Sequence, residues 1–257
     1  MTSPIEPRTA SLYHASRDAA VPATAGGAIT VAAIAAYLLL PALVPAGGAF
    51  LVAQAALLAV PVGWLVATRR PRPFAALGLR GARPRYFFAG AAVGATAWYV
   101  SAVIVARLPL PDEHARVLEA LVEHPPLARA LLGFAVVPAV CEEVLFRGVL
   151  ARSLATSTGV LVAAALSGAI FSLYHVSIVQ ALPTLVLGVV LAVIAIRAGS
   201  VAPTILAHVL NNAIVILLSR HAWPALNAWI ALHPVACLVG CVIATAIGLV
   251  VAARGAA

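Results

Sequence analysis

Long apolar runs separated by short polar links make up most of this chain. A transmembrane helix needs roughly 20 apolar residues, and eight runs near this length occupy residues 27–45, 49–68, 87–106, 128–150, 159–177, 182–197, 201–218 and 234–253. We therefore predict an all-α fold, a polytopic membrane helix bundle of about eight transmembrane helices. In this interpretation residues 1–25 are a polar cytoplasmic tail and residues 26–257 a single transmembrane domain. Kinks or helix ends are expected at the prolines, which lack a backbone N–H: Pro41, Pro61, Pro138 and Pro183.

Composition and charge agree with this pattern. Of the 257 residues, 63% are hydrophobic and only 9% are charged, which excludes an ordinary soluble domain. The net charge of +8 comes from arginines that flank apolar runs, so it predicts topology and no nucleic-acid partner. Six arginines in the link at 69–85 assign that link to the cytoplasm, and the acidic link at 107–126 then lies outside. Both termini are expected in the cytoplasm.

Ionisable side chains within the apolar runs are few. Glu142 and Glu143 lie in the fourth run, His175 in the fifth and His208 in the seventh. Each such group costs about 2.5 to 3.5 kcal/mol in hydrocarbon, so those that are retained are usually paired or functional. A single buried histidine is more often a helix-contact residue than a catalyst, but the combination favours a functional site.

The two glutamates differ in their predicted partners. Glu143 and Arg147 are four residues apart, so they share one helical face and are within reach of an ion pair. Glu142 points about 100° away from its neighbour and lacks that partner. Glu143 thus has a structural explanation, whereas Glu142 does not.

The two histidines have companions at the same spacing. Phe171 precedes His175 by four residues, and Asn212 follows His208 by four. An amide beside an imidazole is suited to donate a hydrogen bond to an oxyanion, whereas Asn211 faces elsewhere and is expected to be a packing residue. One carboxylate, two histidines and an amide supply a base, a proton shuttle and an oxyanion donor, which suffice to split an amide with water.

The order of these residues resembles the three-motif signature of the CPBP intramembrane proteases: Glu142-Glu143-x-x-x-Arg147, Phe171-x-x-x-His175 and His208-x-x-x-Asn212. That family includes the CAAX prenyl endopeptidases, bacteriocin-processing enzymes and a myxosortase-like branch. The resemblance covers residues 127–218, which we take as the catalytic core.

The resemblance implies a role for each motif residue. Glu142 would activate the attacking water with the help of His175, and His208 and Asn212 would stabilise the oxyanion. The remaining motif residues would give structural support: Glu143, Arg147 and Phe171. The implied substrate is a membrane-associated protein or peptide, cleaved within a lipid bilayer, and the arginine-only, alanine-rich composition favours a bacterial cytoplasmic (inner) membrane.

Two mechanisms fit these side chains. We favour a glutamic mechanism with no cofactor, in which Glu142 acts as the base. In the alternative, Glu142, His175 and His208 hold Zn²⁺ and leave one coordination position for water. The helical His-Glu-x-x-His pair typical of zinc peptidases is absent from the chain.

Other classes of function remain open at this point. A proton-coupled transporter would use the same groups as a relay, and a non-catalytic scaffold would bind a partner helix. A thiol nucleophile at Cys141 is disfavoured because adjacent residues project in different directions. With vertical helices, the expected boundaries also spread Glu142, His175 and His208 over about 10 Å or more in depth.

Overall fold

The fold was analysed in a computed structural model, which describes residues 19–107 and 123–254. Within these ranges every regular element is a helix, which confirms the all-α prediction. The elements in chain order are α2 (Ala23–Leu39), η1 (Leu40–Leu43), α3 (Ala46–Ala67), α4 (Pro73–Ala76), α5 (Pro84–Val105), α7 (Leu127–Ala130), η2 (Leu131–Val136), α8 (Val137–Glu142), η3 (Glu143–Ala151), α9 (Arg152–Thr158), α10 (Val160–Tyr174), α11 (Ile178–Ala198), α12 (Ala202–Ser219), α13 (Pro224–Leu232) and α14 (Pro234–Ala253). Most of the predicted tail and of the acidic link lie outside the described residues.

Six of the described helices are long and apolar enough to cross a membrane: Ala23–Leu43, Gly48–Ala67, α5, α11, α12 and α14. Two predicted spans have a different form. The span at 159–177 is the shorter apolar helix α10, and the span at 128–150 is one helical path, α7 to α9, that changes its winding along its length. The chain is an integral membrane helix bundle, and the count of eight spans stays a prediction.

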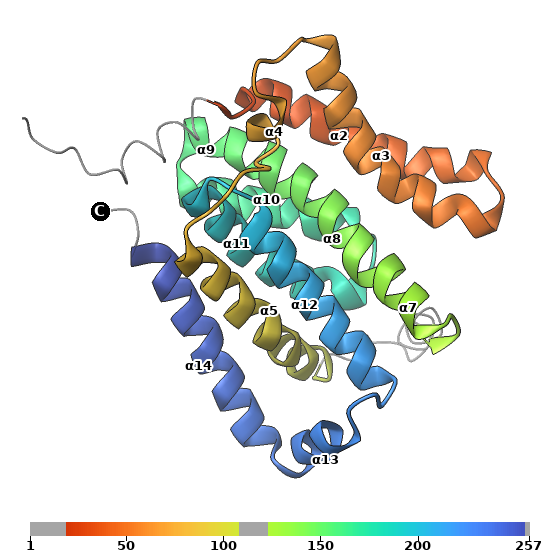
Figure 1. The fold of residues 1–257 in the computed structure, drawn as a ribbon, viewed down its shortest axis with the longest axis vertical. Coiled ribbons are helices and arrows are strands. Elements are labelled where there is room, and N and C mark those ends of the chain that lie inside the picture. The colour runs from red at the N-terminus through yellow and green to blue at the C-terminus, as the bar shows by residue number, and fades with distance from the viewer. Residues whose placement is uncertain (1–18, 108–122, 255–257) are drawn as a thin grey trace, which may run out of the picture.

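The path α7 to α9 forms a central rod of the bundle. The α2–α3 pair contacts one side of this rod, and α12 contacts it from another. Beyond α12, α5 packs between α12 and α14, while α10 and α11 form an antiparallel pair (Figure 1). The rod that carries both glutamates is therefore surrounded by helices from both ends of the sequence.

Small residues set the closest helix contacts. A Cβ atom on Gly94 of α5 would lie 2.3 Å from the carbonyl oxygen of Ala207 in α12, so only glycine fits there. Gly168 of α10 faces Gly188 of α11 in the same manner, with a Cβ on Gly188 only 2.9 Å from the Gly168 Cα. Such small-residue contacts allow close approach of membrane helices. The Gly94 contact holds α12 close to α5 at Ala207, one residue before His208.

The arginine-rich link between α3 and α5 is anchored to the rod. The Nη1 atom of Arg152 donates to the carbonyl oxygens of Ala75 at 3.1 Å and Ala76 at 3.2 Å. Gly78, at φ +74°, accepts a hydrogen bond from the backbone N–H of Val201 at 3.0 Å. The link is thereby held against the start of α12 as well as the end of the rod.

Candidate active site

The two glutamates lie where the winding of the rod changes. α8 ends at Glu142, and wider π-helical turns begin at Glu143. A second π-helical stretch precedes α8, where Pro138 lacks a backbone N–H and crowds the carbonyl of Phe134 four residues earlier. π-helical turns in helices occur often at functional sites. Here both carboxylates are turned into the bundle, with exposed fractions of 4% for Glu142 and 0% for Glu143.

Glu143 joins Arg147 to His208. Its Oε1 atom lies 2.8 Å from Arg147 Nη1, an ion pair by distance although the N–H direction is not that of an aligned hydrogen bond. The same oxygen lies 3.0 Å from Nδ1 of His208. The guanidinium carbon of Arg147 lies 4.1 Å from the centre of the Phe171 ring, a cation–π contact. The expected Glu143–Arg147 pair is therefore present, and it extends to a histidine on another helix.

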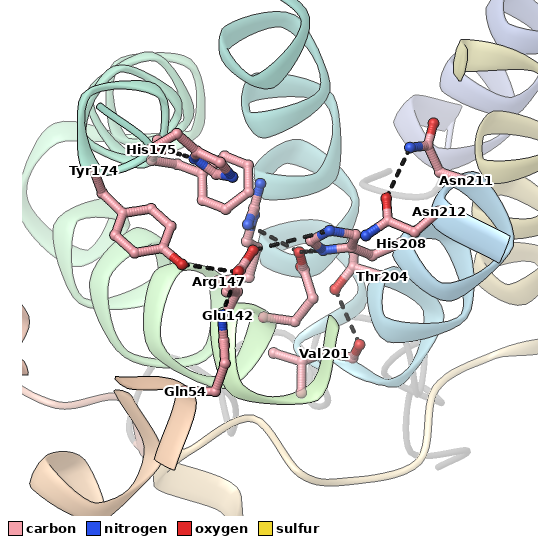
Figure 2. Close-up of polar contacts among 12 residues, drawn as sticks. Gln54, Glu142, Arg147, Tyr174, His175, Val201, Thr204, His208, Asn211 and Asn212 are labelled. Atoms are coloured by element: carbon pink, nitrogen blue, oxygen red, sulfur yellow. Dashed lines mark hydrogen bonds and ion pairs between the residues drawn. The ribbon is translucent and has the colours of Figure 1, made fainter. Parts of the chain in front are cut away.

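Among the described residues Glu142 forms no ion pair with Arg147, as the helical rotation predicted, but it has partners of its own. Tyr174 donates its hydroxyl to Glu142 Oε1 at 2.8 Å, and the Nε2 atom of Gln54 donates to the same oxygen at 3.4 Å. The other oxygen, Oε2, lies 3.9 Å from Nε2 of His208. Figure 2 shows the carboxylate between Tyr174, Gln54 and His208, which come from three different helices.

His175 follows the last residue of α10 and is oriented by its own helix. Its Nδ1 atom lies 2.7 Å from the carbonyl oxygen of Phe171, which can only accept, so Nδ1 carries the proton and Nε2 remains an acceptor in the neutral ring. The ring packs edge-on against Phe171 and Tyr174, at 4.7 Å between centres in both cases. Val176 then adopts a φ of +48°, which is rare for a β-branched residue and ends the helix at this point.

Asn212 is fixed at both ends of its amide. Its Nδ2 atom donates to the carbonyl oxygen of Phe134 at 3.1 Å, and its Oδ1 atom accepts from Nδ2 of Asn211 at 3.1 Å. Asn211, expected only to pack, therefore positions its neighbour (Figure 2). The amide nitrogen of Asn212 has two protons, so one is left for another acceptor.

The expectation that the key residues are spread in depth is wrong for Glu142 and His208, whose nearest side-chain atoms are 3.9 Å apart. The packing of α12 against the rod brings these two together. His175 is joined to the group less directly. Among the described residues, no hydrogen bond or ion pair links His175 to Glu142, His208 or Asn212, and Phe171 and Tyr174 lie against it instead.

Two residues of this site were missed by sequence reasoning. Tyr174 directly precedes His175. Its hydroxyl bonds to Glu142, which is 32 residues away in the sequence, so no local spacing indicated this role. Gln54 could have been noticed, because it is the one polar side chain in a long apolar helix, and a buried amide needs a hydrogen-bond partner. The sequence does not indicate which helix provides that partner.

The residues that the zinc alternative requires are Glu142, His175 and His208. The unshared ring nitrogens and Glu142 Oε2 are suitable zinc donors, and Nδ1 of each histidine bonds to a neighbour in the way metal-ligating histidines commonly do. However, the described part of the chain holds no group of three His, Cys, Asp or Glu residues that could hold one ion.

Cys141, the residue considered as a thiol nucleophile, is buried and has a free thiol.

This arrangement has the parts needed for hydrolysis of an amide. A carboxylate held by one oxygen presents the other beside an imidazole, and an amide donor follows one helical turn later. Glu142, Glu143 and His208 are buried, which strengthens electrostatic interactions among them, whereas His175 and Asn212 are half-buried at the edge of the group.

Comparison with known proteins is consistent with this chemistry. Residues 124–214 match a family model described as type II CAAX prenyl endopeptidase Rce1-like. The matched stretch contains all three motifs but neither α3 nor Gln54. No curated protein and no solved structure matches the chain.

Proposed function

We propose that this chain hydrolyses a peptide bond with a water molecule activated by Glu142, a proposal supported by the match of residues 124–214 to the Rce1-like model of type II CAAX prenyl endopeptidases. The observation that supports this most directly is the asymmetric environment of the Glu142 carboxylate. One oxygen is held by Tyr174 and Gln54, and the other, beside His208, is left to take a proton. A base held in this way takes the proton from a defined direction, which also orients the attacking water.

The proposed reaction begins with a water molecule at Glu142 Oε2. As its oxygen bonds to the carbonyl carbon of the scissile amide, one of its protons passes to Oε2 and the carbonyl oxygen becomes an oxyanion. The C–N bond then breaks, and the proton taken up by Glu142 goes to the leaving amine, which restores the carboxylate. His175 assists through Nε2, since this atom is its free acceptor for a proton in transit.

His208 and Asn212 would stabilise the oxyanion. Because Nδ1 of His208 already donates to Glu143, donation to an oxyanion must come from Nε2, and the ring then carries both protons. Asn212 would use the amide proton that Phe134 does not take. In this scheme Glu143 and Arg147 orient His208, and Phe171 supports Arg147 and His175 by ring contacts.

The substrate we propose is a membrane-associated protein or peptide, cleaved near a lipidated or hydrophobic terminus. The burial of Glu142 and His208 within helices long and apolar enough to cross a membrane supports a substrate that arrives through the bilayer. We further propose a bacterial cytoplasmic membrane with both termini inside, because the arginines of the link between α3 and α5 predict that this link is cytoplasmic.

The test compares Glu142→Gln with Glu123→Gln, which makes the same chemical change outside the apolar spans. Protein termini in membranes that contain each variant are compared by mass spectrometry, and a cleaved peptide found in this way is then assayed with the purified chain in lipid vesicles. Loss of a general base lowers kcat by about 10²- to 10⁴-fold. Wild-type processing by a correctly inserted Glu142→Gln variant would contradict the proposal, whereas Glu123→Gln is expected to match the wild type.

A further inference from the structure

Gln54 lies in α3, outside the stretch that matches the family model, and yet it reaches the base of the proposed reaction. Its side chain is 2% exposed, although its neighbours in the helix are apolar. Its Nε2 atom and the hydroxyl of Tyr174 donate to the same oxygen of Glu142. Two donors on one carboxylate oxygen restrict rotation of the carboxylate, so the other oxygen keeps its direction.

Packing alone does not account for an amide at this position. The Oε1 atom of Gln54 is buried and has no hydrogen-bond partner among the described residues. A buried acceptor without a partner is destabilising, and an apolar side chain of the same length would avoid that cost. Buried polar groups that lower stability in this way are expected at functional sites.

We propose that Gln54 is a positioning residue for the reaction, which holds the Glu142 carboxylate so that Oε2 faces the attacking water. The inference rests on the proposed function, because it assigns Glu142 the role of base. The Nε2–Oε1 distance of 3.4 Å is long for a hydrogen bond. Hydrogen bonds in catalytic sites are often long without substrate and shorten in the substrate complex, so the contact is expected to tighten on binding.

The experiment replaces Gln54 with methionine, which has a similar length and no amide. The matched control is Gln180→Met in α11, since Gln180 is the other glutamine in the chain and lies outside this hydrogen-bond network. Both full-length variants are purified and reconstituted in lipid vesicles, and kcat and KM are measured on a peptide whose cleavage requires Glu142. Loss of a hydrogen bond to a charged group predicts that Gln54→Met lowers kcat by about 10- to 100-fold. KM is expected to stay unchanged, because Gln54 orients the base and does not bind substrate.

A purely structural role gives a different result. It would lower the melting temperature and the active fraction while each folded molecule kept its turnover, so kcat per titrated site would remain at the wild-type value. That result would overturn the inference. A rise in KM with kcat unchanged would also overturn it, since Gln54 would then act in substrate binding.

Failure of the inference can be told from failure of the proposed function. If Glu142→Gln keeps wild-type turnover, the proposed function fails; if Glu142→Gln is inactive and Gln54→Met keeps the wild-type kcat, only the role of Gln54 fails. A measurement that needs no activity completes the test. Thermal unfolding of Gln54→Met, Glu142→Leu and the double variant forms a double-mutant cycle, since leucine leaves no oxygen to which Gln54 could donate, and the contact predicts non-additive shifts in melting temperature. Additive shifts would contradict the contact itself.

Discussion

The side-chain amide of Asn212 donates to the backbone carbonyl of Phe134, at 3.1 Å, and so links α12 to the rod that carries the glutamates. This carbonyl lies four residues before Pro138, which has no N–H to offer it and whose ring crowds it. The carbonyl therefore takes a donor from outside its helix. A proline in the rod thus helps to orient an amide that we assign to the oxyanion site.

Pro138→Ala is expected to weaken this anchor. Alanine supplies a backbone N–H that competes for the Phe134 carbonyl as the rod tightens toward α-helical winding. Loss of one neutral hydrogen bond is worth about 1 kcal/mol, so kcat should fall about fivefold. Thermal stability should be unchanged or higher, because proline inside a helix is unfavourable. In an Asn212→Ala background Pro138→Ala should have no further effect on kcat, and an equal effect in both backgrounds would refute this coupling.

Arg147→Met is expected to be severely destabilising. Both members of the Glu143–Arg147 pair have exposed fractions of 0%, so the variant leaves a buried carboxylate that keeps His208 and Thr204 as neighbours but has lost its cation. Breaking a buried ion pair on one side costs about 3 to 5 kcal/mol. The double variant Arg147→Met/Glu143→Met should recover most of that loss and remain inactive, since His208 loses its orienting partner. Unfolding of the purified proteins in detergent, followed by circular dichroism, measures both effects.

Gly94→Ala should disturb the position of His208. The added methyl would lie 2.3 Å from the Ala207 carbonyl oxygen, so α5 and α12 must move apart. Overpacking of this kind costs about 1 to 3 kcal/mol, and kcat should fall because His208 moves relative to Glu142. Gly63→Ala is the control, because a Cβ there meets no atom within 4 Å. The control should be neutral or more stable by about 0.5 to 1 kcal/mol, and equal behaviour of the two variants would contradict the packing explanation.

The activity is expected to survive removal of divalent metal. In the proposed scheme protons move between water, Glu142, His175 and the substrate, and none of these steps needs a Lewis acid. The purified chain is incubated with 1,10-phenanthroline, and its metal content is measured by mass spectrometry beside its activity. Activity that disappears on chelation and returns only with added zinc would favour the alternative, in which Glu142, His175 and His208 are ligands.

The sequence predicts those parts of the site that depend on spacing along one helix. The Glu143–Arg147 pair follows from a separation of four residues, and the different direction of Glu142 follows from helical rotation. The apolar runs likewise predict the helices, although the run expected at 182–197 begins earlier, at Ile178, and continues through Pro183. These features need only local geometry.

Contacts between helices are the part that spacing does not determine. The link from Glu143 to His208 depends on how α12 lies between the rod and α5, and spacing along one helix does not predict this position. The contribution of Gln54 depends on where α3 docks, and no motif marks that helix. The position of His175 depends on the turn at Val176. The sequence does not predict this turn, because β-branched residues such as valine rarely adopt a positive φ.

In the proposed scheme, the hydrogen bond from α3 to Glu142 couples the entry of a polypeptide to the orientation of the base. Glu142 is 4% exposed, so a peptide reaches it only when neighbouring helices part. If α3 is the helix that moves, the same movement withdraws Gln54 and loosens the carboxylate, which keeps its hydrogen bond from Tyr174. In this scheme the full restraint on the base returns only after α3 has closed again over a bound polypeptide, so an empty site would be less prepared to cut than an occupied one.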